Sequence, residues 1–315
     1  MKPTSINPNR KSFRDFLGLY FRGIAMGTAD LVPGVSGGTI ALITGIYDEL
    51  LGSISAVTPR LILGFLKGEW RASWASLNGN FLVVLAAGIG TSIFGLSSLL
   101  HYLLKHHHTL LYSFFFGLVV ASIPVVAKEI KAKNASVFIA FVIGTATAFG
   151  ISSLPIVQTE PTLLYLFGAG ALAACAMILP GISGSFILLL LGAYAAVIGA
   201  VKSFDLMRIA IIGGGVISGL LIFSKFLKWT LERHYNVILA LLTGFLLGSL
   251  RAIWPWKEKI ELLHTHSDGR ETWSEALAWP AHTAIESWGW AATCALLGMA
   301  LVIVMNRFST SSNHG

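Results

Sequence analysis

Two short polar sequences, each placed directly after a Pro-Gly pair, carry the groups of this chain best suited to binding an anion. They read Ser36-Gly37-Gly38-Thr39 after Pro33-Gly34, and Ser183-Gly184-Ser185 after Pro180-Gly181. Pro-Gly ends a helix abruptly, and small residues with hydroxyl groups favour the start of a new helix. The backbone amides exposed at such a start carry a partial positive charge, which suits a phosphate or a carboxylate.

Ionisable residues accompany these sequences in otherwise apolar surroundings. Arg22 and Asp30 lie roughly on one face of the segment that leads to the first break. We predict that Arg22 supplies charge to the anion and that Asp30 orients Arg22 or exchanges a proton. The alternatives are that Arg22 extends to lipid headgroups and that Asp30 caps a helix or acts as a counter-ion. Arg251 is a candidate headgroup contact or an interfacial anchor. Asp48 and Glu49 are candidates for proton coupling, with a solvated helix end as the alternative.

The other polar clusters do not predict a metal or cofactor site. His106, His107 and His108 are consecutive, so they cannot all face one ion on a helix. Cys175 and Cys294 are isolated in apolar segments. The sequence also has no Walker-type glycine loop that would bind ATP. We therefore expect no cofactor, no metal and no enzymatic activity.

Composition indicates what kind of elements must position these residues. Of 315 residues, 55% are hydrophobic and 12% are charged, and the mean hydropathy is +0.74. A membrane-spanning helix needs about 20 mostly apolar residues. The runs without Asp, Glu, Lys or Arg are 72–104, 106–127, 134–159, 161–201 and 287–306. This pattern predicts an all-α polytopic membrane protein with a single membrane domain over residues 1–315.

The apolar runs are divided by Pro-Gly pairs and by more polar connections. The predicted helices are 14–31, 35–57, 80–104, 109–127, 135–153, 163–179, 182–201, 208–230, 235–253 and 284–306. The aromatic-rich stretches 58–79 and 254–282 are predicted to be interfacial connections.

The sequence repeats internally. Aligning Pro33-Gly34 with Pro180-Gly181 also aligns Tyr47 with Tyr194, and 83–122 aligns without a gap with 210–249. We predict two repeats, 14–153 and 163–306, each a re-entrant hairpin broken by Pro-Gly and followed by three transmembrane helices. Three helices after an even number of crossings make the count odd, so the second repeat should be inverted relative to the first.

The distribution of basic residues gives an orientation. With the N-terminus inside, most of the 22 Lys and Arg residues fall in segments on the inner side, in agreement with the positive-inside rule. Both termini are then expected to be cytoplasmic. The net charge of +7 therefore reflects membrane orientation, and we expect no nucleic-acid partner.

Helix breaks within hydrocarbon survive only where the freed backbone groups are buried in protein or line a hydrated cavity. Equivalent breaks in two inverted halves are typical of transporters that bind a substrate near the midplane and expose it by alternating access. Close packing through small residues is the alternative.

The motifs resemble those of a known family. The stretch "RGIAMGTADLVPGVSGGTIALITGIYDELLGSI" closely resembles the signature of the bacterial polyprenyl-phosphate transporter family PopT, and "ILPGISGSFILLLLGAY" and "GFLLGSLRAIWPW" resemble its second-half signatures. The resemblance covers about residues 14 to 306. It implies a protein of the bacterial inner membrane that returns undecaprenyl phosphate from the outer to the cytoplasmic leaflet.

The expected partners are undecaprenyl phosphate or a related polyprenyl phosphate and the surrounding membrane lipids, and a homodimer is also considered. Three other functions stay open: a secondary transporter of a small soluble anion, a polyprenyl-diphosphate phosphatase, and a membrane scaffold. A phosphatase of the bacitracin-resistance type would require an acidic pair and an arginine at the tip. Both tips here read Pro-Gly-x-Ser-Gly without that arginine.

Overall fold

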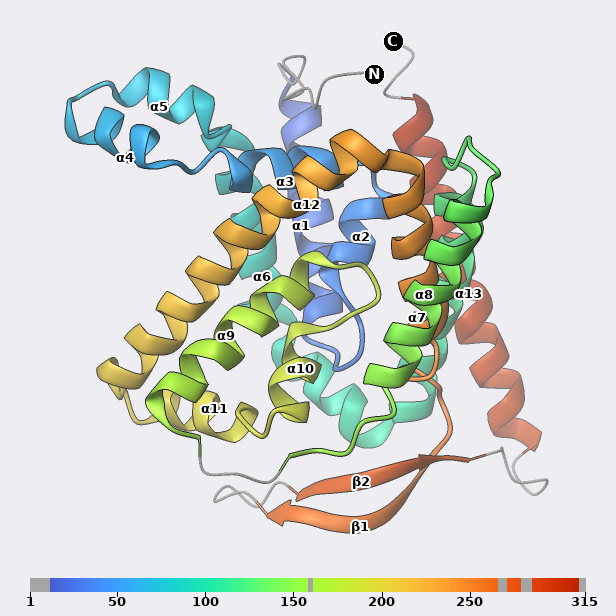
Figure 1. The fold of residues 1–315 in the computed structure, drawn as a ribbon. Coiled ribbons are helices and arrows are strands. Elements are labelled where there is room, and N and C mark those ends of the chain that lie inside the picture. The colour runs from blue at the N-terminus through green and yellow to red at the C-terminus, as the bar shows by residue number, and fades with distance from the viewer. Residues whose placement is uncertain (1–11, 158–160, 266–270, 279–284, 312–315) are drawn as a thin grey trace.

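The computed structural model describes residues 12–157, 161–265, 271–278 and 285–311. Most of them are helical (Figure 1). The helices of the first half are α1 (Phe13–Asp30), α2 (Gly37–Ile43), α3 (Tyr47–Ser55), α4 (Pro59–Leu66), α5 (Trp70–Ser76), α6 (Gly79–His106), α7 (His108–Ala127) and α8 (Ala135–Ile151). The remaining elements are α9 (Leu163–Ile178), α10 (Gly184–Leu190), α11 (Tyr194–Lys202), α12 (Leu206–Ser249), β1 (Lys257–Thr265), β2 (Glu271–Leu277) and α13 (Ile285–Ser311).

The two Pro-Gly breaks enter the molecule from opposite ends. In Figure 1, α1 descends from the end at which the chain begins, and α2 and α3 return to that end. By contrast, α9 rises from the end covered by the strands, and α10 and α11 return there. Each break therefore forms the tip of a hairpin that reaches into the centre of the molecule. We call them the first tip (residues 31–39) and the second tip (residues 179–186).

Several helices have the length and apolarity of membrane spans. Among the described residues, four qualify: α6, α7, α12 and residues 288–307 of α13. The count rises to six if the bent pairs α3–α4 (67°) and α10–α11 (108°) are each one span. At about 1.5 Å per residue, the 44 residues of α12 measure about 66 Å, roughly twice the hydrocarbon thickness. The chain is thus a multi-pass membrane protein.

A break at His234 divides α12 in two. The backbone there is not helical (φ −133°, ψ 46°), and His107 between α6 and α7 has nearly the same conformation (φ −134°, ψ 38°). The separate helices predicted at 208–230 and 235–253 thus meet at a sharp kink, with no loop between them. His107 and His234 are aligned in the sequence repeat, so both halves bend at the same position.

Other backbone features recur at aligned positions. Gly34 and Gly181 of the two tips have φ of 86° and 82°, and Gly45 and Gly192 have φ of 70° and 66°. These left-handed conformations favour glycine because side chains with a Cβ rarely adopt them. The second pair of glycines breaks the returning arm of each hairpin. The single helices predicted at 35–57 and 182–201 are therefore wrong, since each arm is two short helices.

Contacts between helices also recur. A Cβ on Gly88 of α6 would strike the carbonyl oxygen of Tyr20, and a Cβ on the aligned Gly215 would strike that of Phe167, which aligns with Tyr20. The absence of a side chain lets α1 pack on α6, and α9 on the first part of α12, at very short distance. The helix pairs α7–α13 and α12–α8 are likewise in close contact.

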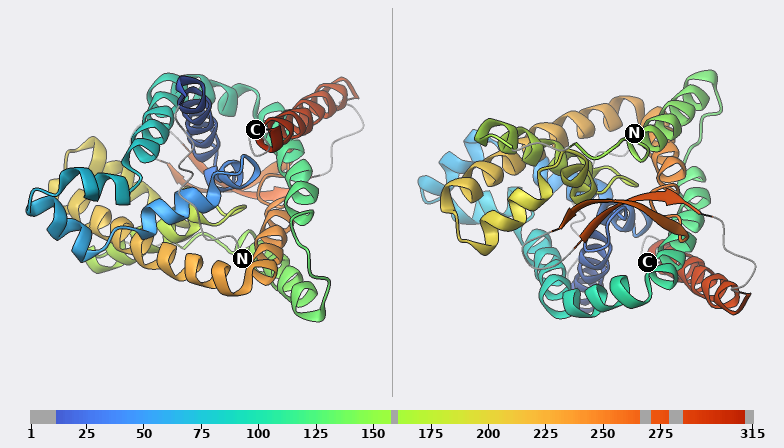
Figure 2. Two further views of the ribbon diagram at one scale, coloured as in Figure 1. Left: turned by 90° about the horizontal axis from the view of Figure 1, so that it is seen from above. Right: turned by 90° about the horizontal axis from the view of Figure 1, so that it is seen from below.

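The prediction that the fold is entirely helical is wrong for residues 257–265 and 271–277. Strands β1 and β2 pair antiparallel there and lie across the end of the molecule opposite the start of α1 (Figure 2, right). The two strands contain charged residues interspersed with apolar ones, and they lie outside the long apolar runs of the sequence. A two-stranded ribbon can form there because water satisfies its outer edges.

Candidate functional site

The two tips meet at the centre of the molecule and are joined by hydrogen bonds. Ser36 Oγ donates to the carbonyl oxygen of Leu179 (3.1 Å), and the backbone N–H of Gly181 donates to Thr39 Oγ1 (3.0 Å). Tyr47 of α3 donates its hydroxyl to the carbonyl oxygen of Ile178 (3.1 Å). The first half of the chain therefore satisfies polar backbone groups that the second break frees, as the low polarity of the surroundings requires.

Packing between the tips is tight. Ser36 and Thr39 are at most 1% exposed. A Cβ on Gly38 would lie only 2.8 Å from the carbonyl oxygen of Ile178 and 3.0 Å from that of Met177. The structure thus holds the tips in a closed contact.

The first tip is already capped by the chain itself. The N–H of Gly37 donates to Asp30 Oδ1 (2.7 Å), and the N–H of Gly38 donates to Ser36 Oγ (3.2 Å). A carboxylate therefore occupies the start of α2, where the partial positive charge of the helix would favour an anion. In this closed arrangement Asp30 therefore has the geometry of a helix cap, which was one of the alternatives predicted for it.

The second tip lacks such a cap. Met177, which aligns with Asp30, lies over Gly184 as Asp30 lies over Gly37. Its thioether cannot replace a carboxylate as a strong acceptor. Ser183 is buried and its Oγ pairs with Ser185 Oγ (2.9 Å), and α10 has no side-chain cap hydrogen bond. The start of α10 thus presents small residues and two hydroxyl groups without a negative partner.

The two candidate arginines lie in different places. Arg22 is partly buried on α1 and, at about 1.5 Å per residue, lies roughly 12 Å along the helix from Asp30. Arg251 follows α12, and its neighbours Ala252 and Ile253 would lie within 3.5 Å of a Cβ on Gly34 in the first tip.

Arg251 carries a polar atom that needs a partner. Its Nε is buried and has no hydrogen-bond partner in the part of the chain that the structure describes. The guanidinium carbon lies 5.0 Å from the centre of the Phe149 ring of α8. The Phe149 ring can hold the guanidinium in place by a cation–π contact, and the unsatisfied N–H beside a helix break is suited to binding a phosphate.

A cavity of about 270 Å³ lies between the returning arm of the first hairpin and the kink of α12, and no residue of either tip lines it. Tyr47, Asp48, Glu129 and Tyr235 provide polar groups to a lining that is otherwise mostly apolar. Because Tyr47 also bonds to Ile178, the residue before the second tip, the cavity lies close to the contact between the tips. In Figure 1 these elements lie toward the end where α1 begins.

Of the two candidate coupling residues, only Asp48 is among the residues that line the cavity. Asp48 lines it and is exposed, whereas Glu49 accepts a hydrogen bond from Asn78 Nδ2 (2.9 Å). Sequence reasoning missed the roles of Tyr47 and Glu129. The alignment of Tyr47 with Tyr194 was a signal for the first of these; nothing in the sequence pointed to Glu129.

Over most of its length the chain is similar in sequence to proteins that are named as transporters. Residues 26–271 match a family model described as VCA0040-like, undecaprenyl phosphate translocase-like. A polyprenyl-phosphate transporter of Vibrio cholerae is 48% identical over 246 residues, which cover 78% of this chain and 80% of that protein. A polyprenyl-phosphate transporter of Staphylococcus aureus is 34% identical over 252 residues, covering 74% of this chain and 84% of that protein. No solved structure matches the chain.

Proposed function

The chain belongs to the VCA0040-like, undecaprenyl phosphate translocase-like family, and on that premise we propose that it moves a polyprenyl phosphate from the outer to the cytoplasmic leaflet. Both named relatives are polyprenyl-phosphate transporters. The observation that carries the proposal is the direct contact between two helix breaks that enter from opposite ends of the molecule.

We propose that the two halves are inverted repeats that rock against each other. Recurrent backbone breaks at aligned positions support a repeated unit, and the opposite entry of the hairpins supports the inversion. The first residues of α1 and the last of α13 lie at one end of the molecule (Figure 1). With the positive-inside rule, that end faces the cytoplasm of a bacterial inner membrane.

Rocking would free the atoms that now join the tips. The hydroxyls of Ser36 and Thr39 and the N–H of Gly181 would become donors once the tips separate. A phosphate monoester carries roughly −1.5 to −2 charges near neutral pH. These groups, with Ser183 and the start of α10, would neutralise it in part while the prenyl chain stays in the lipid.

Charged residues would then act in sequence. Arg251, which follows α12 near the first tip, would receive the phosphate from the outer side because its Nε has no hydrogen-bond partner among the described residues. The carboxylate of Asp30 would give up the N–H of Gly37 to the phosphate, either by protonation or by turning away. Arg22 would hold the phosphate on the cytoplasmic side, and Asp48 would exchange protons with the cavity.

Reconstituted vesicles test the proposal. A fluorescent polyprenyl phosphate should cross the bilayer with the protein, as measured by protection from an impermeant reductant, and unlabelled undecaprenyl phosphate should compete. Transport of inorganic phosphate without lipid would favour a transporter of soluble anions. Release of phosphate from undecaprenyl diphosphate would favour a phosphatase, and no activity of any kind would favour a scaffold.

A further inference from the structure

The helices α4 and α5 are an insertion that interrupts the repeat. The aligned helices α3 and α11 end at Ser55 and Lys202, and the aligned helices α6 and α12 begin at Gly79 and Leu206. Between these points the first half has residues 56–78, whereas the second half has only residues 203–205. The helical body is thus built without α4 and α5, so their role must be sought outside it.

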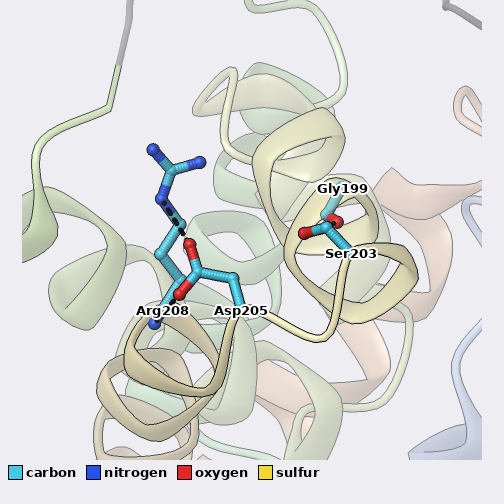
Figure 3. Close-up of polar contacts among 4 residues, drawn as sticks. All are labelled: Gly199, Ser203, Asp205 and Arg208. Atoms are coloured by element: carbon cyan, nitrogen blue, oxygen red, sulfur yellow. Dashed lines mark hydrogen bonds and ion pairs between the residues drawn. The ribbon is translucent and has the colours of Figure 1, made fainter.

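The short connection shows how little chain the body needs (Figure 3). Ser203 Oγ donates to the carbonyl oxygen of Gly199, which ends α11. Asp205 then caps α12 by accepting from the N–H of Arg208 (3.1 Å), and its other oxygen lies 3.3 Å from Arg208 Nε. Three residues therefore complete the turn between two helices.

The inserted helices form a hairpin that points away from the body. In Figures 1 and 2, α4 and α5 project to one side at the end where α1 begins. Gly64 packs on Ser73, since a Cβ at residue 64 would lie 2.6 Å from Ser73 Oγ. Trp74 ties the hairpin to α6 by donating its Nε1–H to Asn80 Oδ1 (2.9 Å). The two helices of the hairpin therefore pack against each other through small and polar residues.

That closure leaves large apolar side chains on the outside. Ile62 and Leu66 of α4 are 53% and 78% exposed, and Trp70 of α5 is 67% exposed. Ile62 and Leu66 are four residues apart and share one face of α4. A face of this kind would be unfavourable in water, and an interfacial helix buries such a face at the boundary between headgroups and acyl chains.

The charges on the hairpin complement an acidic surface. Arg60, Lys67 and Arg71 are exposed, against the single acidic residue Glu69. Arg60 of α4, and Lys67 directly after its last residue, lie away from the face that carries Ile62 and Leu66, as expected of a helix that lies flat on a membrane.

We propose that the α4–α5 hairpin is a membrane-surface anchor that binds anionic phospholipid headgroups at the leaflet next to the start of α1. Its apolar face enters the acyl boundary, Trp70 lies at headgroup level, and the three basic residues contact lipid phosphates. The second half carries no equivalent, so the anchor acts on one leaflet only. The proposal does not depend on which substrate the protein moves.

Depth measurements test the orientation. Cys175 and Cys294 are replaced by alanine, and a spin label is attached through Leu66→Cys or, as the matched control, through Ala72→Cys. Ala72 is exposed on the side of α5 away from Trp70 and Trp74. In nanodiscs the label at 66 should be reached by oxygen from the lipid and the label at 72 by a water-soluble nickel complex. Equal access of the nickel complex to both labels would overturn the proposal.

Lipid selectivity tests the charge. Wild-type protein should associate with spin-labelled phosphatidylglycerol in preference to phosphatidylcholine. The triple variant Arg60→Gln, Lys67→Gln, Arg71→Gln should lose about fivefold or more of that preference, since each basic residue near an anionic surface contributes a factor of that order. The triple variant Lys105→Gln, Lys202→Gln, Arg208→Gln removes the same charge elsewhere and should keep the preference.

A loop replacement tests the lipid preference even if the triple variant of the hairpin folds poorly. Replacing residues 56–78 by the sequence of residues 203–205 should give a folded protein without the preference. Retention of the preference by the loop-replacement variant or by the first triple variant would contradict the proposal. Disulfide formation between copies through residue 66, or cross-linking to a soluble protein from that position, would show that a protein covers this face, and would also contradict it.

Discussion

The two tips share a backbone design but differ in what covers the helix start. Each has Pro-Gly with a left-handed glycine, a serine before the helix and a glycine as its first residue. In the first tip a carboxylate from Asp30 accepts from Gly37, whereas in the second the apolar Met177 takes the same place over Gly184. The pair therefore combines one tip that is neutralised by the chain and one that is not.

This difference shows why two similar breaks need not bind a substrate alike. A site that is free at both tips would hold a doubly charged phosphate strongly and release it slowly. A carboxylate at one tip competes with the phosphate and favours release. We therefore expect the first tip to control turnover and the second tip to contribute more to binding.

Separating the tips should have the largest effect. Gly38→Val would place a side chain against the carbonyl oxygens of Ile178 and Met177, which belong to backbone and cannot move aside. Overpacking of this kind costs about 1–3 kcal/mol. We expect transport to be lost and the melting temperature in detergent to fall. Gly52→Ala and Gly199→Ala are matched controls, since nothing lies within 4 Å of a Cβ at either position. Transport by Gly38→Val at the wild-type rate would show that the contact is not needed.

Placing a carboxylate over the start of α10 should impair transport nearly as much. Met177→Asp would give both tips a carboxylate, which should repel phosphate and weaken binding of a polyprenyl phosphate at least about tenfold. Met177→Leu, which is similar in volume and uncharged, should bind normally.

Asp30→Asn removes the negative charge but keeps an oxygen for the N–H of Gly37. We expect it to bind the lipid as well as the wild type or more tightly and to transport it about tenfold more slowly, because release is no longer assisted. Binding and transport are measured on the same reconstituted samples. Weaker binding by Asp30→Asn would indicate that the carboxylate only stabilises the fold.

The sequence predicted the main breaks because their causes are local. Pro-Gly determines where α1 and α9 end, and the predicted helices 80–104, 109–127, 208–230 and 235–253 already stopped near His107 and His234, where the two kinks lie. The breaks at Gly45 and Gly192 were missed, since a single glycine within an apolar run is compatible with a continuous helix. Only the left-handed conformation of both glycines distinguishes these positions.

Other features of the site depend on the path of the chain between helices. The bond from Gly37 to Asp30 crosses a loop, and the bond from Ser36 to Leu179 joins the two halves of the sequence. Neither follows from helical periodicity. The distance of roughly 12 Å between Arg22 and Asp30 along α1 could have been anticipated from the rise of a helix alone, because the two residues are eight positions apart.

The two arginines should differ in the side of the membrane on which they matter. Arg251→Gln removes a charged donor whose partner is proposed to be phosphate, and a hydrogen bond to a charged group contributes about 1.5–3 kcal/mol. The apparent affinity for lipid presented on the outer side should fall roughly 10- to 100-fold. Arg22→Gln should instead affect lipid presented on the cytoplasmic side. Vesicles with protein in one orientation separate the two effects, and Arg208→Gln serves as a control outside the site. Equal effects from both sides for Arg251→Gln would contradict its proposed position.

The two capping serines provide the smallest and most direct comparison. Ser36 Oγ accepts from the N–H of Gly38 and donates to the carbonyl oxygen of Leu179, whereas within the described part of the chain Ser183 Oγ bonds to Ser185 alone. Ser36→Ala should therefore lower the free energy of unfolding by about 1–2 kcal/mol. Ser183→Ala should lower it by less than about 1 kcal/mol, because the partner that the structure shows for it, Ser185, is a hydroxyl that can turn to another acceptor. Equal losses in denaturant titrations of the two variants would mean that the bond between the tips adds nothing to a simple cap, and the tips would then be independent in the closed state.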